Sequence, residues 1–368
     1  MNYKKIVLLV LGFFVSFVGF SQDAKERNQE NINVNKFRQL YQEFSSPNMF
    51  RTASGAPGPA YYQQQADYKM DIELDDENKR IYGSETITYT NNSPDNLEYL
   101  WVQLDQNIRK KDSPSLLIDG GGVSPAYLPS GFTKEFLTDS FDGGFNIEYV
   151  VDENKNPLKH FVNQTMMRVD LPNILKSGES FSFSIKWWYN IQDHVNQDGR
   201  SGYESFDKDG NRVYIIAQFF PRMAVYNEVE GWQNYQFWGD GEFALPFGNY
   251  DVKITVPSDH ILDATGELQN RKNVFSKEMI KRYNKAKKTY DKPVMIVTQA
   301  EAEEVEKGFS KKKKTWHFQA ENVRDFAFAT SRKFIWDMMA VKIGDKDVMA
   351  VSMYPKEGNP LWEDYSTV

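Results

Sequence analysis

The 368-residue sequence contains no cysteine and only four histidines. Without cysteine the chain forms no disulfide, offers no thiolate to a metal ion, has no cysteine nucleophile and carries no lipid on an N-terminal cysteine. None of His160, His194, His260 and His317 has another histidine four residues away or belongs to an H-E-x-x-H motif. That spacing puts two zinc ligands on one face of a helix. We therefore expect no metal ligands and no cofactor in this chain.

The usual sequence motifs of other enzyme classes are missing as well. The sequence has no G-x-S-x-G nucleophile elbow, no phosphate-binding loop and no dinucleotide fingerprint. The carboxylates Asp240 and Glu242 in "FWGDGEF" resemble a glycosidase pair in spacing, but the glycines at 239 and 241 favour a solvated turn. We therefore predict no catalytic residue.

The chain also lacks an excess of positive charge, since its net charge is −7. Proteins that bind nucleic acid typically carry a basic patch, so we expect no nucleic acid partner. Lysines do gather in "KEMIKRYNKAKKTYDK" (277–292) and "SKKKK" (310–314), which together look like a lysine-dense hairpin region. We interpret them as a solvated turn or amphipathic segment and not as a docking patch for anions.

The N-terminus has the features of a signal peptide. "MNYKK" is positively charged, Ile6–Phe20 is apolar, and Gly19 and Ser21 are small residues at positions −3 and −1 of a cut before Gln22. The apolar run is shorter than the roughly 20 residues that a membrane span needs. We predict a signal peptide at 1–21 and an exported protein, periplasmic or secreted and free of the membrane after cleavage. The alternative is an uncleaved membrane anchor.

Period-two alternation predicts a mainly β fold. After a polar leader arm (22–60), alternation begins at Tyr61 and recurs in separate segments, including 67–75, 80–91, 98–107, 249–257, 293–305 and 314–323. "FNIEYVVDENKNPLKHFVNQTMMRVDL" predicts a hairpin around "DENKNP". Strands at this spacing indicate a large antiparallel saddle or sandwich. After Arg324 we expect a strand, a turn and a strand, then a helix with Asn359 as N-cap and Pro360 at its first position.

The segment "AQFFPRMAVYNEVEGW", Ala217 to Trp232, is too apolar for a surface loop and too polar for a core strand. It is either one wall of a substrate site or the seam where a large β domain closes. We predict mainly a seam, in which Arg222 pairs with a carboxylate such as Glu228.

Several of these segments resemble the aminopeptidase-N family of zinc metallopeptidases, in the form common among exported bacterial members. The first landmark is "YYQQQADYKMDIELDDENKRIYGSETITYTNNSPDNLEYLWVQLDQN". The second is "AQFFPRMAVYNEVEGW" followed by "GDGEFALPFGNYDVKITVP", and the third is "ENVRDFAFATSRKF". The resemblance runs from about Tyr61 to the end of the chain.

The resemblance implies an N-terminal saddle-shaped β domain at 61–330. It also implies, at 331–368, the first strands and helix of an incomplete α+β, thermolysin-like metallopeptidase domain. The family motifs G-[AG]-M-E-N and H-E-x-x-H would then lie beyond Val368. Zinc is accordingly expected in a full-length parent that acts on peptides. This chain alone would be inactive, and it would pack against the missing catalytic domain.

The resemblance also assigns one tentative substrate-binding residue, Gln218. In the family a T-Q-x-[QE] strand holds the free α-amine of the substrate, and the corresponding residues here are "AQFF". Gln218 matches the first Gln, whereas Phe220 replaces the second amide or carboxylate. A phenyl ring offers an ammonium only a cation–π contact, which puts strict aminopeptidase specificity in doubt. Gln218 otherwise serves as a strand-end residue that satisfies backbone groups.

A different class of function remains open at this stage. The chain could be a stand-alone secreted β-sandwich binding module that holds glycans or peptides on its aromatic surfaces, for which the candidates are Trp101, Trp187, Trp188, Trp232 and Trp238. It could also be a catalytically dead family member that serves as a scaffold.

Overall fold

The computed structural model describes residues 47–115, 126, 128–133, 141–197, 201–239, 241 and 243–368. The chain divides into two units, Met1–Tyr61 and Tyr62–Val368. The predicted signal peptide at 1–21 and the Asp240–Glu242 pair lie outside the described residues. In the first unit, residues 47–61 form turns with a bridge between Arg51 and Pro57.

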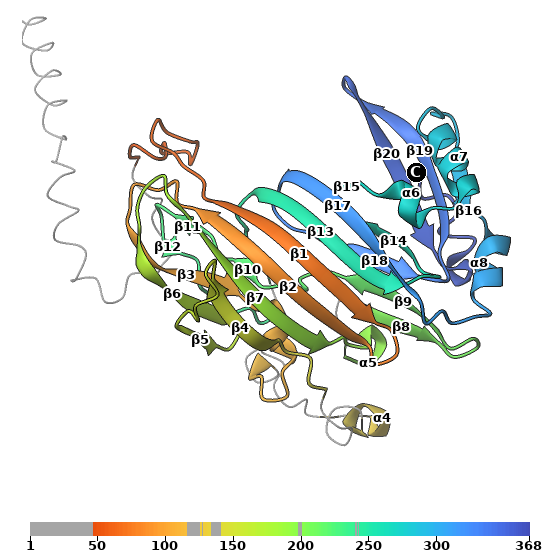
Figure 1. Ribbon diagram of the computed structural model, residues 1–368, viewed down its shortest axis with the longest axis horizontal. Helices are drawn as coiled ribbons and strands as arrows, with labels where there is room; N and C mark the ends of the chain where they lie inside the picture. Colours follow the sequence, from red (N-terminus) through yellow and green to blue (C-terminus); the bar gives the residue numbers. More distant parts are fainter. Residues whose placement is uncertain are drawn as a thin grey trace, which may run out of the picture. The chain divides into compact units, whose positions relative to one another are not determined.

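The second unit is mainly β, as the alternation predicts (Figure 1). Within the described residues its central sheet has the spatial order β15 (Glu267–Leu268), β17 (Lys313–Val323), β13 (Gly248–Pro257), β1 (Gln65–Asp75), β2 (Arg80–Thr90), β7 (Ser180–Asn190) and β4 (Asn146–Asp152). Its pairings are antiparallel except that of β1 with β13, which is parallel.

The other described strands form three smaller sheets and a short β11–β12 ribbon (Tyr226–Asn227, Gly231–Trp232). The β3 sheet has the order β10 (Arg222–Met223), β3 (Leu97–Gln103), β6 (Met166–Leu175) and β5 (His160–Asn163). The β9 sheet has the order β14 (Ile261–Ala264), β18 (Phe328–Ser331), β9 (Asn211–Ile216) and β8 (Gly202–Phe206). The β19 sheet has the order β16 (Val294–Val297), β19 (Ile335–Ile343) and β20 (Lys346–Tyr354).

Helices are short in this part of the chain. They are η1 (Asp105–Arg109), α4 (Pro129–Phe132), α5 (His194–Gln197), α6 (Arg271–Val274), α7 (Lys277–Ala286), α8 (Gln299–Val305) and η3 (Lys356–Gly358). Within the residues described, none of them has the length and apolar character to cross a membrane.

The two faces of the central sheet differ in chemistry because side chains alternate along each strand. On β1 the inner positions Tyr68, Met70 and Ile72 join one hydrophobic core that also takes in residues of β3 and β6. The outer face of β2 and β7 carries cross-strand hydroxyl pairs, among them Thr86–Ser184 at 3.0 Å. The central sheet therefore buries one face and presents a polar other face.

Glu85 breaks the apolar pattern of the inner face. It lies on β2 with 2% of its surface exposed. Burial raises its pKa well above the ordinary value, and the nearby Trp187 indole offsets only part of that rise. Burial therefore favours the protonated, neutral form of this carboxyl group over its charged form.

Replacing Glu85 by glutamine should therefore stabilise the fold more at pH 8 than at pH 5. With a raised folded pKa, stability is fully present below the unfolded pKa of about 4.3 and is lost as pH rises, by about 1.4 kcal/mol per pH unit. Glutamine stays neutral and escapes this loss. Urea unfolding of both proteins at the two pH values measures the difference. A gain in free energy of unfolding that is the same at both would contradict the prediction.

The segments before and after β16 correct two predictions. The strand predicted over 293–305 is a strand only at Val294–Val297, because Thr298 and Glu301 form a reciprocal capping box that starts α8. The lysine-dense residues 277–292 are not a hairpin but contain α7, whose Met279, Ile280 and Tyr283 pack on the core. The interpretation of this region as amphipathic is confirmed.

The hairpin predicted around "DENKNP" is present only as a tight turn: Val151 and Pro157 form an antiparallel bridge, and the Leu158 N–H donates to the Val150 carbonyl at 2.9 Å. The strands on either side then separate, since β4 pairs with β7 in the central sheet and β5 pairs with β6 in the β3 sheet. The helix predicted from Asn359 is absent: η3 ends at Gly358 and turns follow. Leu361 and Trp362 are exposed there. A two-turn helix is marginal without packing, so turns replace it.

The division predicted at residue 330 stays a prediction, but one pairing bears on its description. β16 ends at Val297, before the predicted boundary, and β19 begins at Ile335, after it, yet the two strands pair in the β19 sheet. Phe275 packs edge-on against both Trp316 of the central sheet and Trp336 of β19. An aromatic cluster thus joins the β19 sheet to the central sheet.

Candidate functional site

The segment Ala217–Trp232 leaves the β9 sheet and runs onto the β3 sheet. β9 ends at Ile216, and Gln218 follows with a left-handed backbone (φ 52°). Arg222 then pairs with Gln103 of β3, and the Ala224 N–H donates to the Trp101 carbonyl at 2.9 Å. The segment is therefore a connection between two sheets, which agrees with the prediction of a seam.

Arg222 is the centre of this seam and is 4% exposed. Its Nη2 lies 2.9 Å from Asp105 Oδ1, and its Nε donates to Asp105 Oδ2 at 3.2 Å. Its Nη1 donates to Asp325 Oδ2 at 2.7 Å. The predicted pairing with Glu228 is wrong: β3 pairing sets Arg222 beside Asp105, whereas Glu228 belongs to the turn between β11 and β12.

Two opposing effects act on the Arg222 guanidinium. Burial alone lowers its pKa, but the Asp105 and Asp325 carboxylates outweigh burial and hold the pKa above its ordinary value. The Tyr68 hydroxyl accepts a bond from the Met223 N–H at 2.8 Å, and burial raises the pKa of Tyr68. The charged arginine is thus held between two carboxylates next to a neutral phenol.

The three ion-paired residues come from the three segments that carry the sequence resemblance. Asp105 lies near the end of the first landmark, Arg222 lies in the second and Asp325 in the third. Asp105 and Arg222 are 117 residues apart in sequence, and Arg222 and Asp325 are 103 apart. The landmarks therefore meet in one buried cluster, which we call the Arg222 junction.

Beside the Arg222 junction, η1 presents three consecutive buried polar side chains. Asp105 binds Arg222, and Gln106 donates from Nε2 to the carbonyl of Gln218 at 2.9 Å. Asn107 donates from Nδ2 to the carbonyl of Gln164 at 2.7 Å and accepts from the Phe145 N–H at 2.9 Å. Sequence reasoning extended the strand through these residues. The available signal was the polar run "DQN" directly after an apolar strand.

The structure places Gln218 and Phe220 in different environments. Gln218 is half-buried at the end of β9, and its role toward substrate stays a prediction. Phe220 is fully buried, edge-on to Tyr68 at 5.3 Å between ring centroids and to Phe219 at 5.0 Å. Its ring is therefore enclosed by core aromatics, and a substrate amine cannot reach it to make a cation–π contact.

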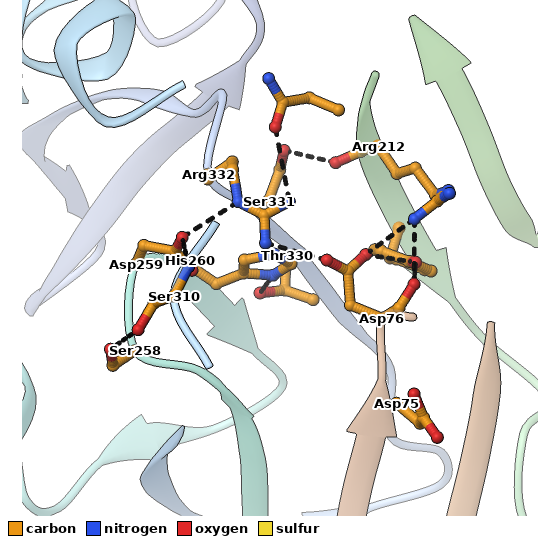
Figure 2. A network of polar contacts seen from close by, with 12 residues as sticks. Asp75, Asp76, Arg212, Ser258, Asp259, His260, Ser310, Thr330, Ser331 and Arg332 are labelled. Atoms are coloured by element: carbon orange, nitrogen blue, oxygen red, sulfur yellow. Dashed lines mark hydrogen bonds and ion pairs between the residues drawn. The ribbon is translucent and has the colours of Figure 1, made fainter. Parts of the chain in front are cut away.

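A second polar network joins the end of β18 to the β1–β2 turn and the β13–β14 turn (Figure 2). Arg332 is 2% exposed; its Nη2 donates to Asp76 Oδ2 at 2.8 Å and its Nε to Asp259 Oδ2 at 3.2 Å. The Tyr214 hydroxyl donates to the other Asp76 oxygen at 2.7 Å. The network ties together β1–β2, β9, β13–β14 and β18, and every charge in it that we name has a partner, so we assign it a structural role.

His260 is buried in this network, and its Nδ1 lies 3.2 Å from Thr330 Oγ1. The Thr330 hydroxyl donates to the Ile261 carbonyl at 2.9 Å, so the Nδ1–H of His260 donates to Thr330. Burial first, and the Arg332 charge second, lower the pKa of His260 to about 3. The imidazole is neutral throughout the physiological range.

Lys333, next to Arg332, is also buried and pairs in another direction. Its Nζ contacts Asp209, lies 3.3 Å from Glu306 and 3.1 Å from Glu357. Lys356 reaches Glu306 as well, at 2.6 Å. These pairs connect the β8–β9 turn, the end of α8 and η3.

The four histidines lie apart. His160 contacts the Leu158 carbonyl, His194 contacts Glu204, His260 contacts Thr330 and His317 contacts Asp251. In the part of the chain that the structure describes, no three His, Asp or Glu side chains gather as metal ligands. These residues do not fit a zinc site.

The tryptophans proposed as a ligand platform are largely packed. Trp187 is fully buried, and Trp101, Trp188, Trp232 and Trp238 are partly buried. Trp101 contacts the exposed Phe161 edge-on at 6.0 Å. A groove of about 800 Å³ lies nearby, lined by residues that include Glu98, Arg168 and Lys176. Its Arg168 is bound to Asp170 at 2.7 Å, which leaves that cation engaged within the protein.

Comparison with known proteins gives likeness in structure only. No family model matches the chain, and no curated protein matches it. The similar solved structures include M1 zinc metallopeptidases. A mutant from Deinococcus radiodurans bound to a Tyr-Ser-Ala substrate has a TM-score of 0.42 and 11% identity, covering 80% of this chain and 48% of that one.

Two others are alike to the same degree. The Deinococcus radiodurans enzyme itself has a TM-score of 0.40 and 12% identity, over 80% of this chain and 47% of that chain. A two-domain M1 zinc metallopeptidase mutant bound to L-tryptophan has a TM-score of 0.41 and 10% identity, over 82% and 50%. The chain thus spans about half the length of these structures.

Proposed function

We propose that this chain is the N-terminal, non-catalytic portion of an exported, zinc-dependent, aminopeptidase-like metallopeptidase. The Arg222 junction is the observation that carries the proposal. The three segments whose sequences resemble the family converge on one ion-pair cluster through Asp105, Arg222 and Asp325. Arg222 and Asp105 are buried, so this cluster holds the three segments together inside the domain.

In this proposal the chain contributes a frame and one wall of the substrate site. Gln218 presents its amide toward the free α-amine of a peptide, whose ammonium group takes amide oxygens as acceptors. Zinc and the general base belong to a part of the parent enzyme outside these 368 residues. Zinc would supply the activated water for peptide hydrolysis.

The partner surface proposed for the rest of the parent lies on the β19 sheet. β20 is an edge strand, paired within the described residues only with β19 (blue in Figure 1). Val348 and Val351 are exposed on opposite faces of β20, since side chains alternate along a strand, and Leu361, Trp362 and Tyr365 after it are exposed as well. An edge strand beside exposed apolar side chains is typical of a surface that another polypeptide covers.

This surface predicts that the purified chain binds a hydrophobic dye. Anilinonaphthalene sulfonate fluorescence should rise with the folded chain, and the double variant Val348→Lys, Val351→Lys should lose most of that rise. The matched control is Val195→Lys with Ile215→Lys, because both residues are exposed but lie away from the β19 sheet. Equal dye binding by all three proteins would contradict the assignment of this surface.

Hydrolysis and metal content test the proposal directly. The purified chain should release no product from an amino-acid arylamide and should hold no stoichiometric zinc. The protein made from a longer reading of the gene should release product and bind zinc. Cell fractionation with mass spectrometry should find the chain outside the cytoplasm and beginning at Gln22. Turnover and stoichiometric zinc in this chain alone would overturn the proposal.

The binding-module alternative keeps one observation in its favour, the exposed Phe161 beside Trp101. Titration of the chain with soluble glycans, with Phe161→Ala as the control variant, tests it. Binding that Phe161→Ala abolishes would support a glycan module and leave the peptidase assignment without a substrate-facing role.

A further inference from the structure

Two turns at one end of the β3 sheet are held by neighbouring side chains of η1. Gln106 binds the carbonyl of Gln218 at 2.9 Å, and Asn107 binds that of Gln164 at 2.7 Å. Both donors are buried, with 4% and 3% of their surface exposed. Both residues that they hold have a left-handed backbone, with φ 52° at Gln218 and 54° at Gln164.

Strand register places the two glutamines at the same end of the sheet. Gln103, the last residue of β3, pairs with Met166 on one side and with Arg222 on the other. Gln164 shortly precedes β6 and Gln218 shortly precedes β10. Because adjacent strands are about 4.8 Å apart, β6 and β10 are about 10 Å apart across β3. The two turns therefore border the end of β3 from opposite sides.

The two left-handed conformations have different causes. Gln164 is the first residue of a two-residue loop between β5 and β6, where a positive φ is common. Gln218 lies in no hairpin, and the left-handed region is disfavoured about fivefold or more for a residue with a side chain. The bond from Gln106 to its carbonyl is the contact at this residue that compensates the unfavourable backbone.

We infer that Gln106 is a positioning residue: it holds Gln218 in the left-handed conformation and so presents the Gln218 amide at the end of the β3 sheet, across β3 from Gln164. The ligand assigned to that amide is a peptide with a free amino terminus, and this assignment rests on the function proposed above. Since Phe220 is buried, Gln164, whose side chain is exposed, supplies a second amide acceptor at this end.

A stability cycle on the chain tests the positioning without reference to function. Glycine adopts the left-handed conformation freely, so Gln218→Gly should increase the ratio of folded to unfolded chain about fivefold. In the Gln106→Leu background residue 218 is free to relax, and the same change should bring no gain. Lys155→Gly, at another left-handed position (φ 67°), is the control and should act equally in both backgrounds.

Two results of the cycle would overturn the inference. One is an equal gain from Gln218→Gly with and without Gln106, since another contact would then hold the backbone. The other is no gain in the otherwise unchanged chain, since the backbone would then carry no strain to relieve. If Gln106→Leu prevents folding, Gln106→Met replaces it, because it keeps the length of the side chain and removes the donor.

Spectroscopy of the side-chain amides separates this inference from the proposed function. In chain labelled with ¹⁵N-glutamine, trialanine should shift the Gln218 and Gln164 amide resonances, and N-acetyl-trialanine should not. Gln106→Leu should abolish the Gln218 shift. A shift that survives Gln106→Leu overturns the positioning role while the function stands. No shift in the unchanged chain, with the stability cycle as expected, refutes the substrate assignment and supports the positioning role.

Discussion

Replacing Arg222 by methionine should lower the free energy of unfolding by about 3–5 kcal/mol, the usual effect of removing one partner of a buried ion pair. Asp105, 1% exposed, would be left in the core with an uncompensated charge. Asp325 would suffer less, because 40% of its side chain is open to solvent. Urea unfolding followed by tryptophan fluorescence measures the change.

Two companion variants define what that loss means. Arg271→Met breaks an ion pair with the largely exposed Glu267 and should cost less than about 1 kcal/mol. The double variant Arg222→Met, Asp105→Leu removes the stranded charge and should recover much of the stability. A single-variant loss under 1 kcal/mol would show that the Arg222 junction does not hold the three landmark segments together.

Lowering the pH from 7 to 5 should destabilise the folded chain by about 2 kcal/mol through His260 alone. Its folded pKa of about 3 lies below the unfolded value of about 6.5, so the unfolded chain takes up a proton that the folded chain refuses. The stabilising contribution is complete above pH 6.5 and is lost as pH falls toward 3. Arg332 and Lys314 oppose the imidazolium, while Asp76 and Asp259 favour it.

The variant His260→Gln isolates this effect from opposing ones. Burial raises the pKa of Asp263 to about 6, which stabilises the folded chain as pH falls through 6 and masks part of the loss. Asp263 is the same in both proteins, so the difference in free energy of unfolding between them reports His260. That difference should change by about 2 kcal/mol between pH 7 and 5. A constant difference would contradict a buried neutral imidazole.

Long alternating strands were predictable because their signal is local. The predicted ranges 67–75, 80–91, 249–257 and 314–323 agree closely with β1, β2, β13 and β17. The signal failed where two elements share one apolar run: β16 passes into α8 at Thr298, and only the capping-box spacing marks the change. The helix predicted after Asn359 failed for the opposite reason, since local signals were present but no packing surface supports them.

The candidate site was predictable only in part. The unusual mixture of apolar and polar residues in Ala217–Trp232 correctly indicated a seam. The partners of Arg222 could not be read from sequence, since they lie more than 100 residues away in either direction. The nearer Glu228 was therefore the wrong choice. Gln106 and Asn107 were missed because the polar run "DQN" marks the end of the strand but does not show that its side chains are buried.

The parallel pairing of β1 with β13 has a consequence for how the chain folds. Asp67 and Asn249, which this pairing brings into contact, are 182 residues apart. During synthesis β2 can pair with β1 and β7, but β1 keeps an unpaired edge until β13 has been made. That open edge can pair with another chain, so refolding should take milliseconds to seconds or longer and lose yield as protein concentration rises.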